Sequence, residues 1–178
     1  MLPEVVVILS VAVYIILFLQ LRSAFVPFQL VFTILCAVVF ALALLSILYF
    51  HILQLPILNF STLFVVVTML GVGTDYNIFL VTRIREGVVN GMSDADAIKS
   101  AIGKVWVTIL GLGLILSSVF LSVAFAGVGL LSEIGLSISA AVMLDVAVNV
   151  LFFVPALMAI TSKYNWWPSN VVREETRG

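Results

Sequence analysis

The residue with the most distinctive chemistry is an aspartate inside an otherwise apolar stretch. Asp75 lies in the run LGVGTDY at 70–76, near the end of a mostly apolar segment at 57–81 that is long enough to cross a bilayer. A carboxylate at the centre of a membrane helix costs about 2.5–3.5 kcal/mol even on lenient insertion scales. Such a group is retained when it has a partner, lines a wet cavity or carries protons, so we expect Asp75 to mark a functional site.

Asp75 belongs to a polar stripe on one face of this predicted helix. The members follow one another at seven-residue intervals, or about two helical turns: Ser61, Thr68, Asp75 and Thr82. Gly71 lies one turn before Asp75, and Tyr76 adds a hydroxyl on a side chain that points about 100° around the helix. In lipid, such a stripe faces other helices or a water-filled crevice. Small hydroxyl residues alone would suit a packing seam, whereas packing does not require the carboxylate.

A second polar stripe follows the predicted helix at 134–161. Its members are spaced by four residues: Ser137, Ala141, Asp145 and Asn149. Asn149 lies one turn from Asp145 and can hydrogen-bond either form of the acid. Two interpretations stay open, because Asp145 can lock this helix to its neighbours or belong to the functional site. In the segment at 105–130, small residues predict a face for close helix packing: Gly111, Ser118, Ser122 and Ala126.

The chemistry that these acids offer is proton exchange. No lysine or arginine lies inside the apolar segments to pair with Asp75 or Asp145. Desolvation disfavours the charged form of a carboxylate, so an acid in this setting is suited to gain and lose a proton. We therefore predict a proton-relay role for Asp75. We expect neither enzymatic activity nor a cofactor, metal or nucleic-acid partner.

Composition places these acids in an integral membrane protein. Of 178 residues, 63% are hydrophobic and 10% are charged, against roughly 25% charged in an ordinary soluble domain. Five apolar segments reach spanning length, at about 4–21, 27–50, 57–82, 105–130 and 134–161. Only helices are plausible across the bilayer for such runs. We predict an all-α polytopic protein of the cell membrane that forms a single transmembrane domain over 1–178.

The distribution of charge predicts the orientation. All eight basic residues fall on one side of the predicted spans: Arg22, Arg83, Arg85, Lys99, Lys104, Lys163, Arg173 and Arg177. By the positive-inside rule this side is cytoplasmic, which puts the N-terminus outside and the C-terminus inside. On the same side, a short amphipathic helix is predicted at about 93–103, the alternative being that this loop is a simple connector. Ser93 would cap it together with Asp96, and its apolar face would lie on the membrane surface.

The run GVGTDYNIFLVTRIREG at 71–87 resembles the MmpL family of the resistance-nodulation-division (RND) transporter superfamily. Leu144-Asp145, the later run Pro155-Ala156-Leu157 and the terminal run NWWP at 165–168 are similar to the same family, so the resemblance covers nearly the whole chain. SecD and SecF translocation proteins also carry an intramembrane aspartate before an Arg-x-Arg-Glu tail. They usually lack the Asp-Tyr pair.

The resemblance implies half of an RND-type transmembrane domain, namely the five-span block that follows a porter domain. It implies a proton relay at Asp75 and Tyr76, which would face the equivalent pair of a second half, and it matches Phe79 to a bulky residue one turn on. Residues that could support this site are Thr68, Gly71, Asp145 and Asn149. The sequence departs from the family pattern in two respects. We expect neither the first span nor the porter domain within these 178 residues, and Val150 stands where many relatives have an arginine.

The leading functional hypothesis is a proton-coupled transmembrane module of an MmpL/RND-type exporter of lipids or other hydrophobic compounds. Its expected partners are membrane lipids, a porter domain and a second transmembrane half. That half would come from a second copy in a homodimer or from another repeat of the parent protein. The alternatives are a non-transporting membrane scaffold or accessory subunit of a larger complex, and a SecD/SecF-like translocation component.

Overall fold

The computed structural model describes residues 2–47, 59–162 and 164–167, and these residues form helices joined by short turns. The helices are α1 (Leu2–Leu21), α2 (Phe25–Ile47), α3 (Asn59–Val89), α4 (Asp94–Ala124), α5 (Gly129–Leu144), the π-helix η2 (Asp145–Phe153) and α6 (Val154–Ile160). Because α5, η2 and α6 follow one another without a break, they form one long rod. Within these described residues, five helices are long and apolar enough to cross a membrane, which confirms the prediction of an all-α, multi-pass membrane protein.

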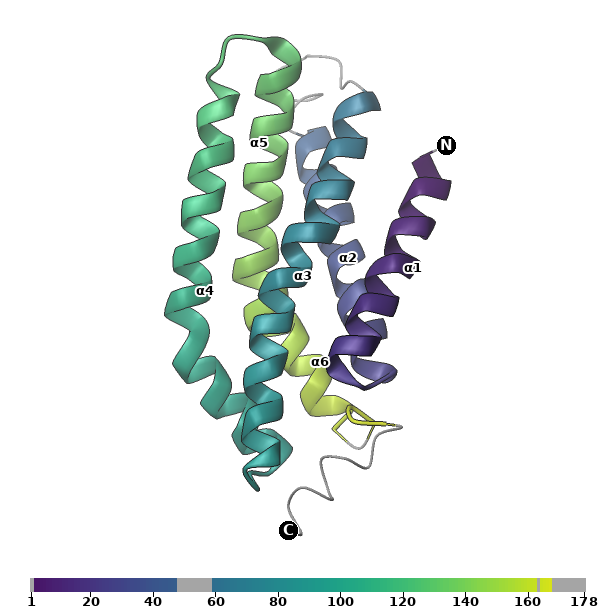
Figure 1. Cartoon of the computed structure of the whole chain (residues 1–178). Helices are drawn as coiled ribbons and strands as arrows, with labels where there is room; N and C mark the ends of the chain where they lie inside the picture. The colour runs from purple at the N-terminus through teal and green to yellow at the C-terminus, as the bar shows by residue number, and fades with distance from the viewer. Residues whose placement is uncertain (1, 48–58, 163, 168–178) are drawn as a thin grey trace.

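The helices form a bundle with α3 near its centre (Figure 1). Helix α3 contacts α1, α2, α4, α5 and η2. The turn between α3 and α4 lies at the same end of the bundle as the end of α1 and the end of α6, at the bottom of Figure 1. We call this end the basic end, because the basic residues of the described part of the chain lie at or near it: Arg22, Arg83, Arg85, Lys99 and Lys104.

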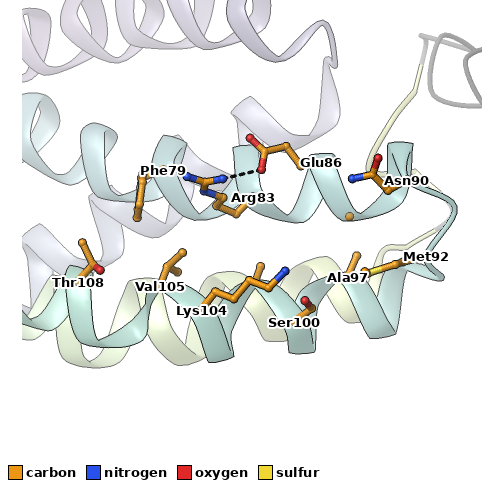
Figure 2. A pocket seen from close by; sticks show the side chains of 12 residues that line it. Phe79, Arg83, Glu86, Asn90, Met92, Ala97, Ser100, Lys104, Val105 and Thr108 are labelled. Carbon is orange, nitrogen blue, oxygen red and sulfur yellow. Dashed lines mark hydrogen bonds and ion pairs between the residues drawn. The ribbon is translucent and has the colours of Figure 1, made fainter.

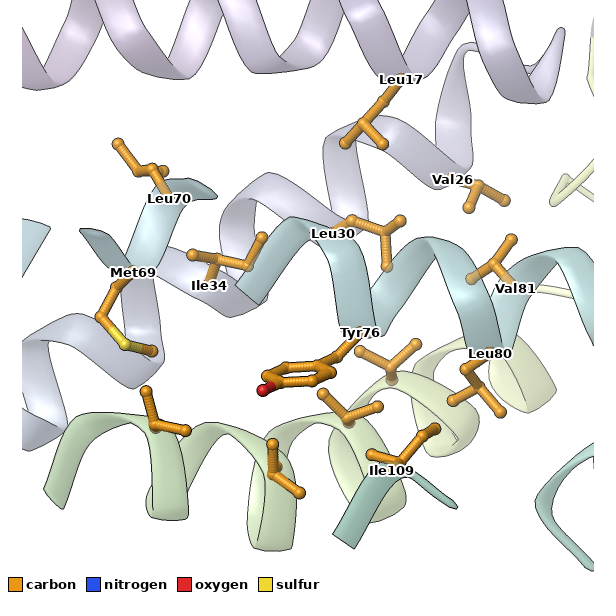
Figure 3. Close-up of a cluster of buried hydrophobic side chains, with 14 of the residues drawn as sticks. Leu17, Val26, Leu30, Ile34, Met69, Leu70, Tyr76, Leu80, Val81 and Ile109 are labelled. Carbon is orange, nitrogen blue, oxygen red and sulfur yellow. The ribbon is translucent and has the colours of Figure 1, made fainter. Parts of the chain in front are cut away.

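Apolar side chains fill the core and also cover much of the outer surface. Leu17 of α1, Leu30 of α2 and Met69 of α3 are fully buried, and Met69 extends toward α5 (Figure 3). By contrast, large apolar residues such as Ile8 and Leu19 of α1 are more than 60% exposed. An outer surface of this composition suits contact with lipid tails, which are as apolar as leucine.

The turn between α3 and α4 is built on a glycine and a capping serine. Gly91 has a φ of 85°, a conformation that costs a residue with a side chain far more than glycine. Ser93 is the N-cap of α4, its Oγ accepting from the backbone N–H of Asp96 (3.2 Å) and donating to the Asp96 carboxylate (2.7 Å). The start of this helix was therefore predictable from its capping residues.

The amphipathic helix expected at about 93–103 on the membrane surface differs in the structure. The segment is the first part of α4, and α4 continues without interruption through the fourth span. Its apolar face packs on α3, because Ala97 and Ala101 are buried and an added Cβ at Gly87 would lie 2.9 Å from the Ala97 Cβ. Figure 2 shows Ala97 directed from α4 toward α3. The same apolar spacing suits a membrane surface or a neighbouring helix, and here α3 extends to Val89 and provides the helix.

Small residues bring α4 and α5 into close contact. Ser117 Oγ of α4 lies 2.7 Å from Ser139 Oγ of α5, and both side chains are buried. An added Cβ at Gly113 would lie 2.9 Å from the side chain of Val146, and one at Gly135 would lie 2.6 Å from the carbonyl oxygen of Phe120 in α4. These glycines are therefore needed for the two backbones to approach.

The face predicted to pack on the fourth span is not the one that packs within this bundle. Ser118 and Ser122 are exposed, and each donates a hydrogen bond to a carbonyl of its own helix. Nothing lies within 4 Å of an added Cβ at Gly111. In a membrane helix both faces are apolar or small, so hydropathy alone does not distinguish the face toward lipid from the face toward a neighbour.

The fifth span changes its helical register at Asp145. From this residue to Phe153 the helix is π-helical, and the backbone N–H of Val154 donates to the carbonyl of Asn149, five residues earlier. Pro155 follows directly and has no N–H to donate, and in an α-helix its ring would clash with the carbonyl four residues before it. A wider π-turn relieves this conflict, and such turns are frequent at functional sites.

The residues that follow α6 form hydrogen bonds with several helices at the basic end. Ser23, in the turn between α1 and α2, is fully buried and donates through Oγ to the carbonyl of Asn165 (2.6 Å). Asn165 Nδ2 donates to the carbonyl of Met158 in α6 (2.7 Å). Trp166 Nε1 donates to the carboxylate of Asp94, the first residue of α4 (3.2 Å). The run NWWP that contributed to the family resemblance thus begins with residues that join three parts of the bundle.

Candidate functional site

Asp75 lies on the outer side of α3, where its side chain is exposed. It lines a cavity of about 400 Å³ between α1 and α3, together with Gln20, Thr74 and a set of mainly apolar residues: Val13, Ile16, Leu70, Gly71 and Ile78. Nothing lies within 4 Å of an added Cβ at Gly71. The structure therefore places Asp75 and Gly71 together on an open side of the bundle.

The rest of the polar stripe on α3 faces the same way. Thr82 is exposed and Thr68 is half-buried, while the side chain of Ser61 lies outside the part that the structure describes. The stripe therefore points away from the core of this five-helix block. Thr68 and Asp75 are brought to one face, as their spacing predicted, and that face is an outer one.

Tyr76, unlike Asp75, lies in the core of the bundle. Its side chain is 8% exposed and extends from α3 toward α5 and η2 within the apolar core (Figure 3). Consecutive residues of a helix are rotated by about 100°, which is enough to separate an outer position from a core position here. The two members of the Asp75-Tyr76 pair thus belong to different surroundings within one block.

Asp145 lies in the core, at the first position of η2, with 1% of its surface exposed. Asn149 Nδ2 donates to Asp145 Oδ1 at 2.7 Å, as the four-residue spacing predicted. Asp145 Oδ2 has no hydrogen-bond partner among the described residues, and it would lie 3.1 Å from a Cβ added at Gly73 of α3. The absence of a side chain at Gly73 is what lets the carboxyl approach the backbone of α3.

The second polar stripe faces the interior of the bundle along its whole length. Its four members are each less than 6% exposed: Ser137, Ala141, Asp145 and Asn149. The structure thus separates the two stripes. The stripe on α3 lies outside with Asp75, and the stripe on α5 and η2 lies inside against α3.

Asn77 is a polar core residue that the sequence interpretation did not single out. It is fully buried, its Nδ2 donates to the carbonyl of Gly73 (2.9 Å), and its Oδ1 has no partner within the described part of the chain. Thr74 is also buried and donates to the carbonyl of Leu70. An amide inside an apolar span is a signal of the same kind as Asp75, and it could have been used to find Asn77.

Phe79 is separated from the surroundings of Asp75. It is half-buried and lines a different cavity, between α3 and α4 at the basic end. The guanidinium carbon of Arg83 lies 5.7 Å from the centroid of its ring, a distance at which a cation is attracted to an aromatic face. The geometry therefore assigns Phe79 to the basic end.

Proton exchange is the chemistry that this arrangement can perform. One carboxyl is open to a cavity on the outer side of α3, and another is enclosed on the core side next to Gly73. Among the described residues no group of three or more histidines, cysteines or acids could hold a metal ion. Both acids can carry a proton, and their different exposure gives them different access.

Comparisons with known proteins agree on one family. The profile of the MMPL family matches residues 3–177. The heme uptake protein MmpL11 of Mycobacterium tuberculosis (strain ATCC 25618 / H37Rv) is 35% identical over 173 residues, which make up 93% of this chain and 18% of that protein. The mycolic acid-containing lipids exporter MmpL11 of Mycolicibacterium smegmatis is 40% identical over 97 residues, or 54% of this chain and 10% of that protein.

A more distant relative is the siderophore exporter MmpL5 of Mycobacterium tuberculosis (strain CDC 1551 / Oshkosh). It is 26% identical over 162 residues, which make up 91% of this chain and 16% of that protein. The chain therefore spans less than a fifth of the length of these relatives.

Proposed function

Because the chain belongs to the MMPL family, as the run at 71–87 predicted, we propose that it is a transmembrane transport module in which Asp75 carries protons. The proposed activity is the proton-coupled export of lipids or other hydrophobic compounds. The observation that carries this proposal is the exposure of Asp75 on α3, beside a cavity and within a helix otherwise suited to the bilayer. Simple helix packing gives no reason for a carboxylate at that place.

The same exposure supports a partner for the outer face of α3. A carboxylate facing lipid tails is costly, and Thr82 and Thr68 extend the polar surface on either side of Asp75. A second transmembrane half that covers this face would provide polar contacts and enclose a path for protons. This half is either a second copy of the chain or another repeat of a longer protein.

The available energy is sufficient for such a mechanism. One proton moving down a potential of 100 mV releases about 2.3 kcal/mol, and each unit of pH difference adds about 1.4 kcal/mol. A free energy of this size changes the ratio of two helix arrangements more than tenfold. Protonation of Asp75 would remove its charge, and with it the cost of moving that side chain past apolar neighbours.

The interior acid has a supporting role in this proposal. Asp145 is held by Asn149 and lies against α3 at Gly73, three residues before Tyr76. A movement of α3 that follows protonation of Asp75 would therefore change the contact between Gly73 and Asp145. The π-helical segment that begins there has a backbone register that can adjust. In this way the outer acid and the rod formed by α5, η2 and α6 would be coupled through α3.

The proposed cargo follows the names of the relatives, and the proposed porter domain follows the family resemblance. Their names attribute heme uptake to one protein, export of mycolic acid-containing lipids to another and siderophore export to a third. We propose a cargo of the lipid or hydrophobic class for the protein that contains this module. A porter domain would belong to the large part of such a protein that this chain does not cover.

The test is proton-driven efflux from proteoliposomes that contain the intact protein carrying this chain. Asp75→Asn keeps the size and hydrogen-bonding capacity of the side chain but removes the exchangeable proton, so it should abolish coupled efflux while the protein stays folded. Asp96→Asn is a matched control, because it makes the same exchange at an exposed position near the start of α4. Undiminished efflux by Asp75→Asn would contradict the relay and favour the scaffold or accessory alternative.

A further inference from the structure

A cavity of about 390 Å³ lies between α3 and α4 at the basic end, away from the one that Asp75 lines. Its lining includes one aromatic, three charged and two hydroxyl side chains: Phe79, Arg83, Glu86, Lys104, Ser100 and Thr108. Figure 2 shows these side chains on the facing stretches of α3 and α4, with Phe79 directed toward α4 and Glu86 directed away from it in this view. The proton-relay proposal makes no use of this cavity.

The charged side chains that line the cavity favour the binding of an anion. Arg83 pairs with Glu86 at 2.8 Å, but the two side chains are 48% and 52% exposed, and an exposed pair of this kind is weak. Lys104 is exposed and forms no ion pair within the described part of the chain. The cavity is therefore lined by two cations and one carboxylate: Arg83 and Glu86 lie on α3, and the unpaired Lys104 lies on α4.

The cavity is also amphipathic along its length. At one end the half-buried ring of Phe79 and the buried Val105 give it apolar walls, and the ring lies beneath the Arg83 guanidinium. At the other end it reaches Asn90, in the turn after α3. Asn90 follows Phe79 by eleven positions, which corresponds to about 16 Å along a helix, so the cavity crosses from the apolar part of α3 to the predicted cytoplasmic boundary.

We propose that this cavity binds the phosphate-bearing headgroup of an anionic amphiphile. The phosphate lies between Arg83 and Lys104, where the guanidinium offers a bidentate donor and the ammonium a point charge. Ser100 and Thr108 provide hydroxyl donors on α4, and the apolar part of the ligand follows Phe79 toward the membrane interior. Anionic phospholipids of the cytoplasmic leaflet are the nearest source of such a group, and a soluble phosphate ester is the other.

Native mass spectrometry of the intact protein in detergent tests the proposal, with phosphatidylglycerol as the probe. Diacylglycerol with the same acyl chains is the reference that lacks phosphate. Arg83→Gln and Lys104→Gln should each weaken phosphatidylglycerol binding about fivefold, the factor expected for one basic residue at an anionic surface. Glu86→Gln removes the competing carboxylate and should strengthen binding. Lys99→Gln is the matched control, because Lys99 is an exposed lysine of α4 outside the cavity.

Two results would overturn the proposal. One is equal binding of diacylglycerol and phosphatidylglycerol, and the other is a loss with Lys99→Gln as large as with Lys104→Gln. A third arm adds glycerol 3-phosphate at millimolar concentration. Displacement of phosphatidylglycerol by this compound supports headgroup recognition that a soluble phosphate ester can share, whereas no displacement supports recognition that also needs the acyl chain. Thermal unfolding of each variant checks that the fold is retained.

Discussion

Asp75 and Asp145 lie on opposite sides of the same helix. Asp75 is exposed on the outer face of α3, and Asp145 Oδ2 faces α3 at Gly73 from within the core. Gly73 and Asp75 are two residues apart, which corresponds to about 200° of rotation around the helix. One helix thus separates an acid with access to a cavity from an acid that is enclosed.

Removal of the Asp145 carboxyl should destabilise the protein. Asp145→Ala leaves the buried Asn149 amide without its acceptor and should cost about 1 kcal/mol, the order of hydrogen bonds measured between membrane helices. Asp145→Asn keeps an acceptor at the Oδ1 position and is the control. Thermal unfolding in detergent measures both variants. Equal stability of the two would show that the contact between Asn149 and Asp145 contributes nothing to the fold.

Gly135 should tolerate no side chain. Its added Cβ would lie 2.6 Å from backbone atoms of Phe120 and Ala124, and backbone atoms cannot move aside without separating α4 from α5. We expect Gly135→Ala to lower the free energy of unfolding by about 1–3 kcal/mol. Gly111→Ala, on a helix position with open space around it, should instead raise it by about 0.5–1 kcal/mol. Denaturant titration compares the two, and a neutral Gly135→Ala would mean that α4 and α5 do not approach as described.

The contact between these helices illustrates what the sequence could and could not predict. The number of spans follows from apolar runs, and the start of α4 follows from Ser93 and Asp96. The rotation of α4 was predicted wrongly, because Gly113 faces η2 and Ser117 faces α5 where Gly111 and Ser118 were expected to pack. Lipid and neighbouring helices are both apolar surroundings, so a hydropathy pattern fixes the length of a membrane helix better than its rotation.

In the candidate site, too, some features could be predicted from the sequence and others could not. Spacing alone correctly placed Asn149 against Asp145. That Asp75 faces outward while Tyr76 faces the core depends on which side of α3 the rod of α5, η2 and α6 occupies. This contact between distant parts of the chain is not encoded in any local pattern. The π-helix at Asp145–Phe153 was also not predicted, although Pro155 gives a physical reason for it.

The Ser23 hydroxyl should stabilise the turn between α1 and α2. Ser23→Ala removes the bond from Oγ to the carbonyl of Asn165 and leaves a buried acceptor unsatisfied, at a cost of about 1–3 kcal/mol. Ser118→Ala is the control, because Ser118 is exposed and bonds only within its own helix. Thermal unfolding that is lowered equally by both variants would contradict the role of Ser23 at the basic end.

The two ends of α4 should be reached from opposite sides of the membrane. In a Cys36→Ala background, Met92→Cys lies in the turn before α4 and Val128→Cys in the turn after it, and both residues are exposed. A membrane-impermeant thiol reagent added to intact cells should label position 128, and position 92 should be labelled only after the cytoplasmic side is made accessible. Labelling of both positions in intact cells would contradict the orientation derived from the basic residues.

The most direct test of the central claim is to observe the proton on Asp75. Infrared difference spectroscopy of the intact protein in bilayers resolves the carbonyl stretch of protonated carboxylic acids as the pH is changed. We predict a pH-dependent carboxylic acid band that is present in the unmodified protein and in Asp96→Asn, and that is absent in Asp75→Asn. Identical spectra for the unmodified protein and Asp75→Asn would show that Asp75 does not exchange a proton and would contradict its proposed role in transport.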